Sequence, residues 1–149
     1  MNSTLLLAAS FGLIFARAAR AQEAPSAEDR LAAALESVMT DEVVDAVGQC
    51  STPDYAGWTT VSRPGAMFFD CVRRPGERTG DAKAFLPTDA VQKALAAQGL
   101  SYYVDYSIYD VATKTVLDRA AVERAAARAV EHQKALKAMN GAGAALPKS

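Results

Sequence analysis

The chain is poor in the residues that build most metal and redox centres. Its 149 residues include one histidine, two cysteines and one tryptophan. The cysteines do not form a Cys-x-x-Cys motif and the histidine, His132, lies far from both, so the ligand set of a transition-metal site is missing. A phosphate-binding glycine loop, a dinucleotide fingerprint and a zinc-protease motif are missing too. We therefore expect neither a cofactor nor a metal ion.

The chain also lacks an excess of basic residues over acidic ones. Lysines and arginines number 16 against 17 aspartates and glutamates, which gives a net charge of -1. Domains that bind DNA or RNA present a positive field to the phosphates, and this composition does not supply one. We expect no nucleic acid among the partners.

The chain has no apolar run long enough to cross a bilayer. The run from Leu5 to Ala16 has about a dozen residues, whereas a spanning helix needs roughly 20. It is followed by Ala19-Arg20-Ala21, a small-x-small pattern that signal peptidase accepts, and then by polar residues. These features predict a signal peptide over residues 1–21, cleaved before Gln22, and a periplasmic or secreted protein with no stable membrane span.

Two alternatives to a cleaved signal stay open, because the first four residues carry no lysine or arginine. One is an uncleaved membrane anchor, for which the apolar run is short. The other is a transit peptide leading to an organelle lumen or matrix, since the first 22 residues contain arginine, serine and threonine but no acid.

Export to an oxidising compartment predicts a disulfide between Cys50 and Cys71. Residues 22–140 have the length of one domain, and the glycine- and alanine-rich residues 141–149 are expected to form a flexible tail. The disulfide is interpreted as structural, because closing a loop of this size stabilises a fold by roughly 3 kcal/mol.

Hydrophobic periodicity predicts an α+β fold held by this one disulfide. Helices are expected over 27–47 with a break near Thr40, from a cap at Thr88 to Gly99, and over 119–140 after a cap at Asp118. Strands are expected over 57–62, 66–73, 100–110 and 115–117, the first two joined as a hairpin. We expect a small antiparallel sheet of three or four strands, with about three helices packed mainly on one face.

Period-2 alternation also assigns faces to two of these strands. In the second strand, Met67, Phe69 and Cys71 should face the first helix. Along residues 100–110, the alternation places one set of side chains in the core: Tyr102, Val104, Tyr106 and Ile108. In the last helix, the inner stripe is expected at Val122, Ala126, Ala129, Leu136 and Met139.

The other face of the strand over 100–110 is the preferred contact surface. It carries Tyr103, Asp105 and Tyr109, which would form an aromatic recognition patch with one anionic group, and Trp58 near the first hairpin would widen it. The alternative is that a helix or the tail covers this face and the tyrosines only pack.

Arginines gather in the charged segment after the second strand. Arg73, Arg74 and Arg78 are candidates for binding an anion, because guanidinium groups match phosphate and carboxylate oxygens. The alternative is a solvated loop that Glu77 and Asp81 partly neutralise.

These observations predict an exported small binding or accessory protein of the bacterial envelope rather than an enzyme. It would contact a partner protein through the tyrosine-rich strand or the C-terminal helix, whose alanines allow close approach of another helix. One alternative is a small periplasmic hydrolase or lyase that uses the strand carboxylates Asp70, Asp105 and Asp110. Another is a structural subunit of a larger envelope assembly.

Overall fold

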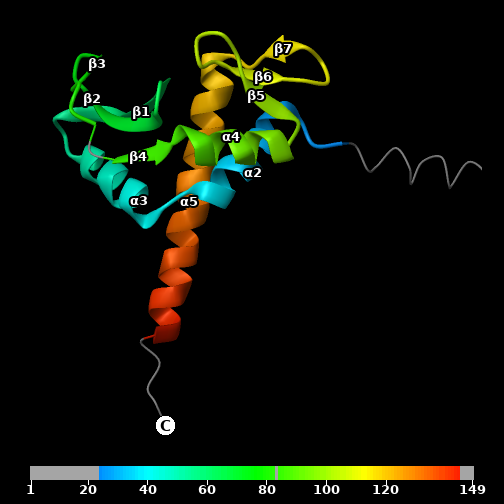
Figure 1. Cartoon of the computed structure of the whole chain (residues 1–149). Coiled ribbons are helices and arrows are strands. Elements are labelled where there is room, and N and C mark those ends of the chain that lie inside the picture. Colours follow the sequence, from blue (N-terminus) through cyan, green and yellow to red (C-terminus); the bar gives the residue numbers. More distant parts are fainter. Residues whose placement is uncertain (1–23, 83, 145–149) are drawn as a thin grey trace, which may run out of the picture.

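The fold joins helices with two small antiparallel sheets, which confirms the predicted α+β class. The structure is a computed structural model that describes residues 24–82 and 84–144. This part of the chain forms four α-helices, a sheet of four strands and a sheet of three (Figure 1). The predicted signal peptide over 1–21 and the tail residues 145–149 lie outside the described residues.

The first helical stretch consists of two helices that meet at the predicted break. They are α2 (Ala27–Val38) and α3 (Asp41–Gly48). Ser26 and Asp29 form a capping box at the start of α2, and the Thr40 hydroxyl accepts a hydrogen bond from the Val43 N–H at the start of α3. Each cap satisfies amides that a helix start leaves free, so Thr40 begins a new helix.

The predicted hairpin is present and consists of β1 (Tyr55–Arg63) and β2 (Ala66–Arg73), with β2 as the central strand of the four-stranded sheet. On its other side, β2 pairs first with β4 (Ala84–Pro87) and then, at its end, with β3 (Glu77–Arg78). Met67 and Phe69 of β2 are buried in the core with residues of α2 and α3, in agreement with the predicted inward face.

The predicted disulfide is present. Cys50 lies in η1 (Gln49–Ser51), a short 3-10 turn after α3, and bonds to Cys71 of β2 with an S–S distance of 2.03 Å. The bond therefore ties the end of the helical segment to the sheet.

Helix α4 (Thr88–Ala97) starts differently from the prediction. Pro87 occupies the N-cap position and no side chain caps the helix, so the assignment of Thr88 as the cap was wrong. The Thr88 hydroxyl donates instead to the Arg63 carbonyl oxygen at 3.4 Å. Gly99 follows the helix with φ of 69°, a left-handed conformation that glycine adopts without strain.

The single strand predicted over residues 100–110 was wrong, because this segment folds back on itself. It forms β5 (Leu100–Tyr102) and β6 (Ile108–Asp110), and β7 (Thr115–Val116) completes the second sheet. The expected strands are thus divided between two sheets.

The turn between β5 and β6 explains this difference. The Tyr106 N–H donates to the Tyr103 carbonyl at 3.0 Å, and the Tyr103 N–H donates to the Ser107 carbonyl at 2.8 Å. Tyr106 adopts a φ of 62° in this turn. The predicted core side is confirmed for Ile108, but it was wrong for Val104, which lies in the turn and is 87% exposed.

The last helix, α5 (Arg119–Ala144), is longer than predicted because it continues through Gly141. Asp118 caps it as expected by accepting a hydrogen bond from the Ala121 N–H at 2.7 Å. Residues 141–144 are therefore helical, although a flexible tail was predicted from residue 141.

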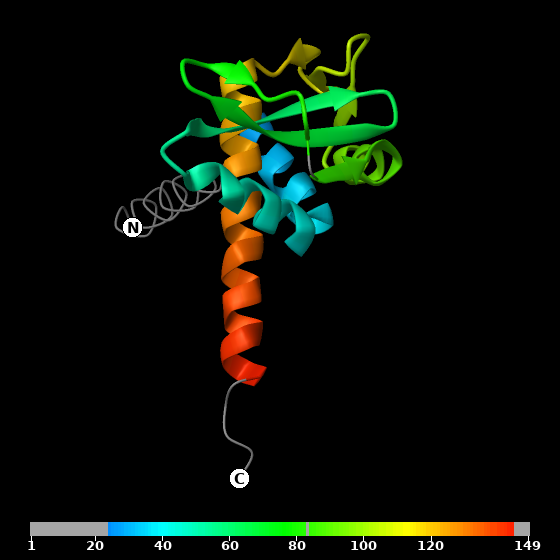
Figure 2. The ribbon, with the colours of Figure 1, turned by 90° about the vertical axis from the view of Figure 1, so that its left-hand side faces the viewer.

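Only the first half of α5 is buried. Ala126 and Ala129 are fully buried on the side that packs against α2, whereas Leu136 is 40% and Met139 is 68% exposed. The second half projects beyond the body of the domain (Figures 1 and 2). The prediction of one continuous inner stripe was therefore wrong for Leu136 and Met139, because the body does not extend far enough to cover them.

Candidate functional site

The outer side of the second sheet exposes a group of large apolar side chains. Tyr109 of β6 is paired with Ser101 of β5 and with Val116 of β7, so these residues share one face. Tyr103 stacks on Tyr109, with 5.2 Å between the ring centroids and an interplanar angle of 20°. We call Tyr103, Tyr109 and Val116, with Val104 and Val111 in the adjoining turns, the tyrosine face.

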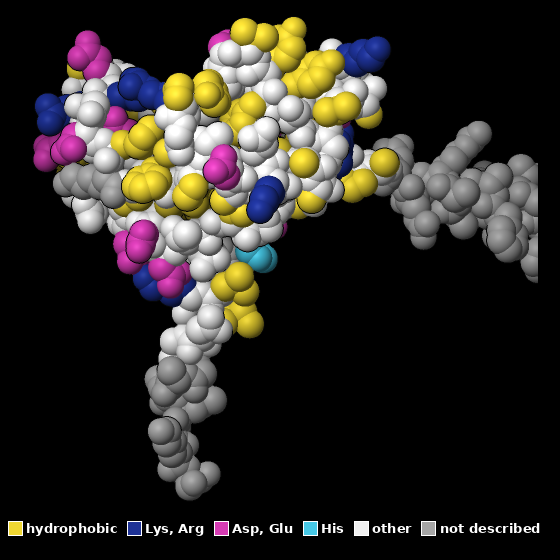
Figure 3. All heavy atoms as spheres, viewed as in Figure 1, with side chains coloured by type: hydrophobic (Ala, Val, Ile, Leu, Met, Phe, Trp, Pro, Cys, Tyr) yellow, Lys and Arg dark blue, Asp and Glu magenta, His cyan; other side chains and the backbone are white. Residues whose placement is uncertain are grey.

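Much of the tyrosine face is open to solvent. The exposed fractions of Tyr103, Val111 and Val116 are 52%, 52% and 49%. Hydrophobic side chains gather over β5–β7 at the top of the space-filling view (Figure 3). The structure thus brings Tyr103 and Tyr109 together, as predicted, but from two strands of a hairpin rather than from one strand.

The opposite side of this sheet is fixed to the body of the domain. Leu100 and Ile108 are buried in the core, and the buried Asp110 forms an ion pair with Arg30 of α2 at 2.8 Å. The hydrogen bond from Arg30 lowers the pKa of Asp110 below its usual value of 3.8, so the carboxylate stays charged at neutral pH. Arg30 also donates to the Gln98 carbonyl at 2.8 Å. The tyrosine face therefore has a packed and hydrogen-bonded support.

The two other residues predicted for this surface have local roles. Asp105 is exposed in the β5–β6 turn and accepts hydrogen bonds from the hydroxyl and amide of Ser107, at 2.6 and 3.2 Å. These bonds, the one from the hydroxyl first, lower the pKa of Asp105. Trp58 lies in β1 of the first sheet, where it packs on the core with its ring centroid 5.9 Å from that of Phe69.

Of the three arginines predicted to bind an anion, only Arg73 lines a cavity. It is the last residue of β2 and its side chain is exposed. The Arg74 side chain donates to the Pro53 carbonyl at 3.0 Å, and Arg78 lies in β3 opposite Val72. Arg74 therefore fixes the chain that leads into β1.

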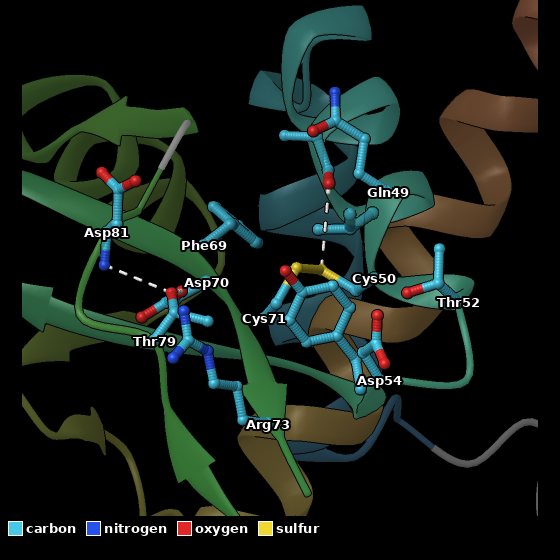
Figure 4. A pocket seen from close by; sticks show the side chains of 13 residues that line it. Gln49, Cys50, Thr52, Asp54, Phe69, Asp70, Cys71, Arg73, Thr79 and Asp81 are labelled. Atoms are coloured by element: carbon cyan, nitrogen blue, oxygen red, sulfur yellow. Dashed lines mark hydrogen bonds between the residues drawn. A yellow bond between two sulfur atoms is a disulfide. The ribbon is translucent and has the colours of Figure 1, made fainter.

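The cavity lined by Arg73 has a volume of about 410 Å³. Its walls come from the end of α3, η1, the start of β1, the second half of β2 and the loop after β3, and the disulfide is part of its lining (Figure 4). This volume lies within the range of pockets that bind small molecules. Its polar lining includes Gln49, Thr52, Asp54, Tyr55, Asp70, Arg73, Thr79 and Asp81.

The three strand carboxylates considered for acid–base chemistry do not form one site. Asp110 is paired with Arg30, and Asp105 is bonded within its turn. Asp70, which is 4% exposed, is the one that lines the cavity together with Arg73. Its Oδ2 accepts a hydrogen bond from the Gly80 N–H at 2.9 Å, and its Oδ1 accepts one from the Thr79 hydroxyl.

Sequence reasoning did not place Asp54 or Thr79 in a cavity. Both lie in loops next to a proline or a glycine, a pattern that indicates a turn but not which part of the fold the turn approaches. The cysteine pair was the sequence feature that could have placed Asp54 near β2. The disulfide brings η1, which lies shortly before Asp54 in the chain, beside β2.

Neither a metal centre nor a membrane span is found in the described part of the chain. Within residues 24–82 and 84–144, no three histidine, cysteine or acidic side chains are placed to hold a metal ion together. The helices over the same residues are too short or too polar to cross a membrane. Comparison of the chain with protein-family models, with curated proteins and with solved structures finds no match.

Proposed function

We propose that this protein is an exported accessory protein that binds a partner protein of the bacterial envelope through the tyrosine face. The observation that carries the proposal is the stacked pair of Tyr103 and Tyr109, which lies near exposed valines on a sheet whose other side packs on the core. Aromatic side chains on a supported surface supply large contact areas at low cost in conformational entropy, and they are enriched among residues that dominate binding energy.

The charge pattern indicates what kind of partner surface would fit. The exposed members of the tyrosine face are uncharged, while the exposed charged residues Asp105 and Lys114 lie in the turns of the same sheet. An apolar patch with polar residues at its edge matches the centre of a protein interface. The expected partner surface is therefore apolar or aromatic rather than charged.

The disulfide supports the proposed location. A bond between the only two cysteines persists in oxidising compartments such as the periplasm or the exterior of the cell. It agrees with the signal peptide that the sequence predicts over residues 1–21.

The projecting half of α5 supports a second candidate contact surface. Leu136 and Met139 lie on it with exposed side chains. Figure 3 shows hydrophobic side chains below the body of the domain. A partner that binds there would use the contact through the C-terminal helix that the sequence predicts. Alternatively, the protein would be a structural subunit whose C-terminal helix is buried in a larger assembly. The tyrosine face is favoured because it combines aromatic side chains with a packed support.

The experiment places a photo-crosslinking amino acid at Val104, at Met139 or at Gln92, an exposed residue of α4 outside both surfaces. Crosslinking in intact cells, followed by mass spectrometry, should give one partner from position 104 and none from position 92. The partner is then purified, and its affinity for the isolated protein is measured directly.

A matched pair of substitutions decides the contact surface in the purified complex. Tyr103→Ala should weaken binding by about tenfold or more, as expected for an aromatic anchor, while Gln92→Ala should leave the affinity unchanged. Loss of binding with Met139→Ser and retention with Tyr103→Ala would overturn the proposal in favour of α5. Absence of any crosslink from position 104 would also overturn it.

A further inference from the structure

The cavity beside the disulfide lies at a gap in the four-stranded sheet. On the side away from β1, β2 pairs with β4 up to Phe69 and with β3 from Val72 onward. None of the described residues, 24–82 and 84–144, pairs as a strand with Asp70 or Cys71 on that side. The loop after β3 lies there instead, with the Thr79 N–H donating to the Cys71 carbonyl at 3.1 Å. The change of partner strand therefore leaves a recess into which β2 presents polar groups.

Asp70 is a buried carboxylate that lines this recess and forms no ion pair with the described residues. It is 4% exposed, and no lysine or arginine in the described part of the chain lies within ion-pair distance of it. Each of its oxygens accepts one hydrogen bond, from Thr79 and from Gly80, although a carboxylate oxygen accepts about two. Because a buried charge is stabilised by a counter-charge, Asp70 favours a cationic group in the cavity.

The other charged side chains that line the cavity do not stabilise the described fold through ion pairs or side-chain hydrogen bonds. The side chains of Asp54, Asp81 and Arg73 are exposed and make no ion pair or side-chain hydrogen bond with other described residues. They approach from two sides, with Asp54 near η1 and the other two near the end of β2 and the loop that follows β3 (Figure 4). Among the described residues, the charged side chains that line the cavity are thus three carboxylates and one guanidinium.

Apolar groups complete the lining. Val47, Phe69 and the disulfide sulfurs form a surface against which a small aliphatic group would pack. Pockets that bind small molecules combine such a wall with a few polar groups that fix the orientation of the ligand.

We propose that this cavity binds a small zwitterion that carries both an ammonium and a carboxylate group, such as a short peptide or an amino acid. The ammonium group is recognised by the carboxylates around Asp70, and the ligand carboxylate is recognised by Arg73, whose guanidinium suits that geometry. A simple cation lacks a partner for Arg73, and a simple anion meets three carboxylates. This site is separate from the tyrosine face, so neither proposal depends on the other.

The test uses the purified protein with its disulfide intact and the dipeptide alanyl-alanine as the probe. Amide NMR spectra are recorded as the dipeptide is added up to millimolar concentration. Saturable shifts are expected at residues of the cavity, including Gln49, Thr52 and Thr79, and not at the tyrosine face. N-acetylated and C-amidated forms of the same dipeptide, which lack one charge each, should bind at least about tenfold more weakly, as for a lost charge-assisted hydrogen bond.

Two arginine variants supply the matched control. Arg73→Gln should abolish the preference for the free carboxylate over the amide, whereas Arg78→Gln, at an exposed arginine outside the cavity lining, should retain it. The amide spectra also report whether each variant is folded. The proposal is overturned if alanyl-alanine gives no saturable shifts, if all three dipeptides bind equally, or if both variants behave alike.

Discussion

Arg30, Gly99 and Asp110 form a small unit that fixes the second sheet. The Arg30 guanidinium lies between the Gln98 carbonyl and the Asp110 carboxylate, 2.8 Å from each. A side chain at Gly99 would place its Cβ 3.4 Å from Arg30 Nη1, and the φ of 69° at this position disfavours any other residue. Glycine at position 99 therefore allows the chain to turn at the end of α4, and it leaves room for the Arg30 guanidinium beside the backbone.

This unit predicts a pH dependence of stability. The pKa of Asp110 is lower in the folded state than its usual value of 3.8, so its contribution is fully present above that value and is lost as the pH falls through the lower folded pKa. We expect Asp110→Asn to be clearly less stable than the wild type at pH 7. The difference should shrink toward pH 3 or below, as measured by urea unfolding at each pH.

Arg30→Gln is the matched control for this pH dependence. It keeps the carboxylate but removes the cation, so Asp110 is left buried and unpaired. Acidification neutralises that carboxylate, and the deficit of this variant relative to the wild type should also shrink at low pH. If the deficit of Asp110→Asn were the same at pH 7 and pH 3, the ion pair would not contribute as a charge pair.

At the scale of secondary-structure elements, the sequence correctly predicted helix caps and a hairpin turn, which depend on residues close together in the chain. Ser26, Thr40 and Asp118 cap helices as expected, because N-capping depends on a residue and its near neighbours. The β1–β2 hairpin was predicted from Pro64 and Gly65 for the same reason.

The β5–β6 hairpin shows where such patterns fail. Apolar and polar residues alternate from Tyr102 to Tyr109 with the period of a strand, yet the chain reverses between them. The reversal depends on the Asp105–Ser107 hydrogen bonds and on a positive φ at Tyr106, a conformation that a tyrosine rarely adopts. The Asp105–Ser107 bonds are local turn chemistry, but the apolar–polar alternation was read as one strand, so the turn was missed although the two key tyrosines were found.

Helix α5 illustrates a second limit, because periodicity gives the direction of an apolar stripe but not the length of the surface that covers it. Ala129 is buried against the domain, whereas Leu136, about two turns further along the same stripe, is exposed, as is its neighbour Ala135. We expect Ala129→Leu to destabilise the protein by about 1–3 kcal/mol through overpacking. Ala135→Leu is the matched control and should have little effect on the free energy of unfolding, as measured with urea. Equal destabilisation by both changes would contradict the observed burial.

At the scale of the whole molecule, α5 closes the domain by packing its first half against α2, at the other end of the described chain. Residues nearly a hundred positions apart form ion pairs across this contact, including Arg124 with Glu28 and Arg128 with Asp29. These pairs are largely open to solvent, so each contributes little to the free energy of unfolding. The buried alanines of α5, which let the two helices approach closely, therefore carry most of the contact.

This division of α5 predicts different outcomes for two truncated chains. A chain that ends at Gln133 keeps every residue of the helix that is described as buried, and of the described contacts it loses the exposed Lys137–Asp45 pair. It should therefore unfold cooperatively at nearly the wild-type temperature. A chain that ends at Asp118 uncovers α2, including the fully buried Leu31 and Leu35, and should show no cooperative transition by circular dichroism. A large loss of stability in the longer chain would show instead that the projecting half of α5 is buried in solution, as in a structural subunit.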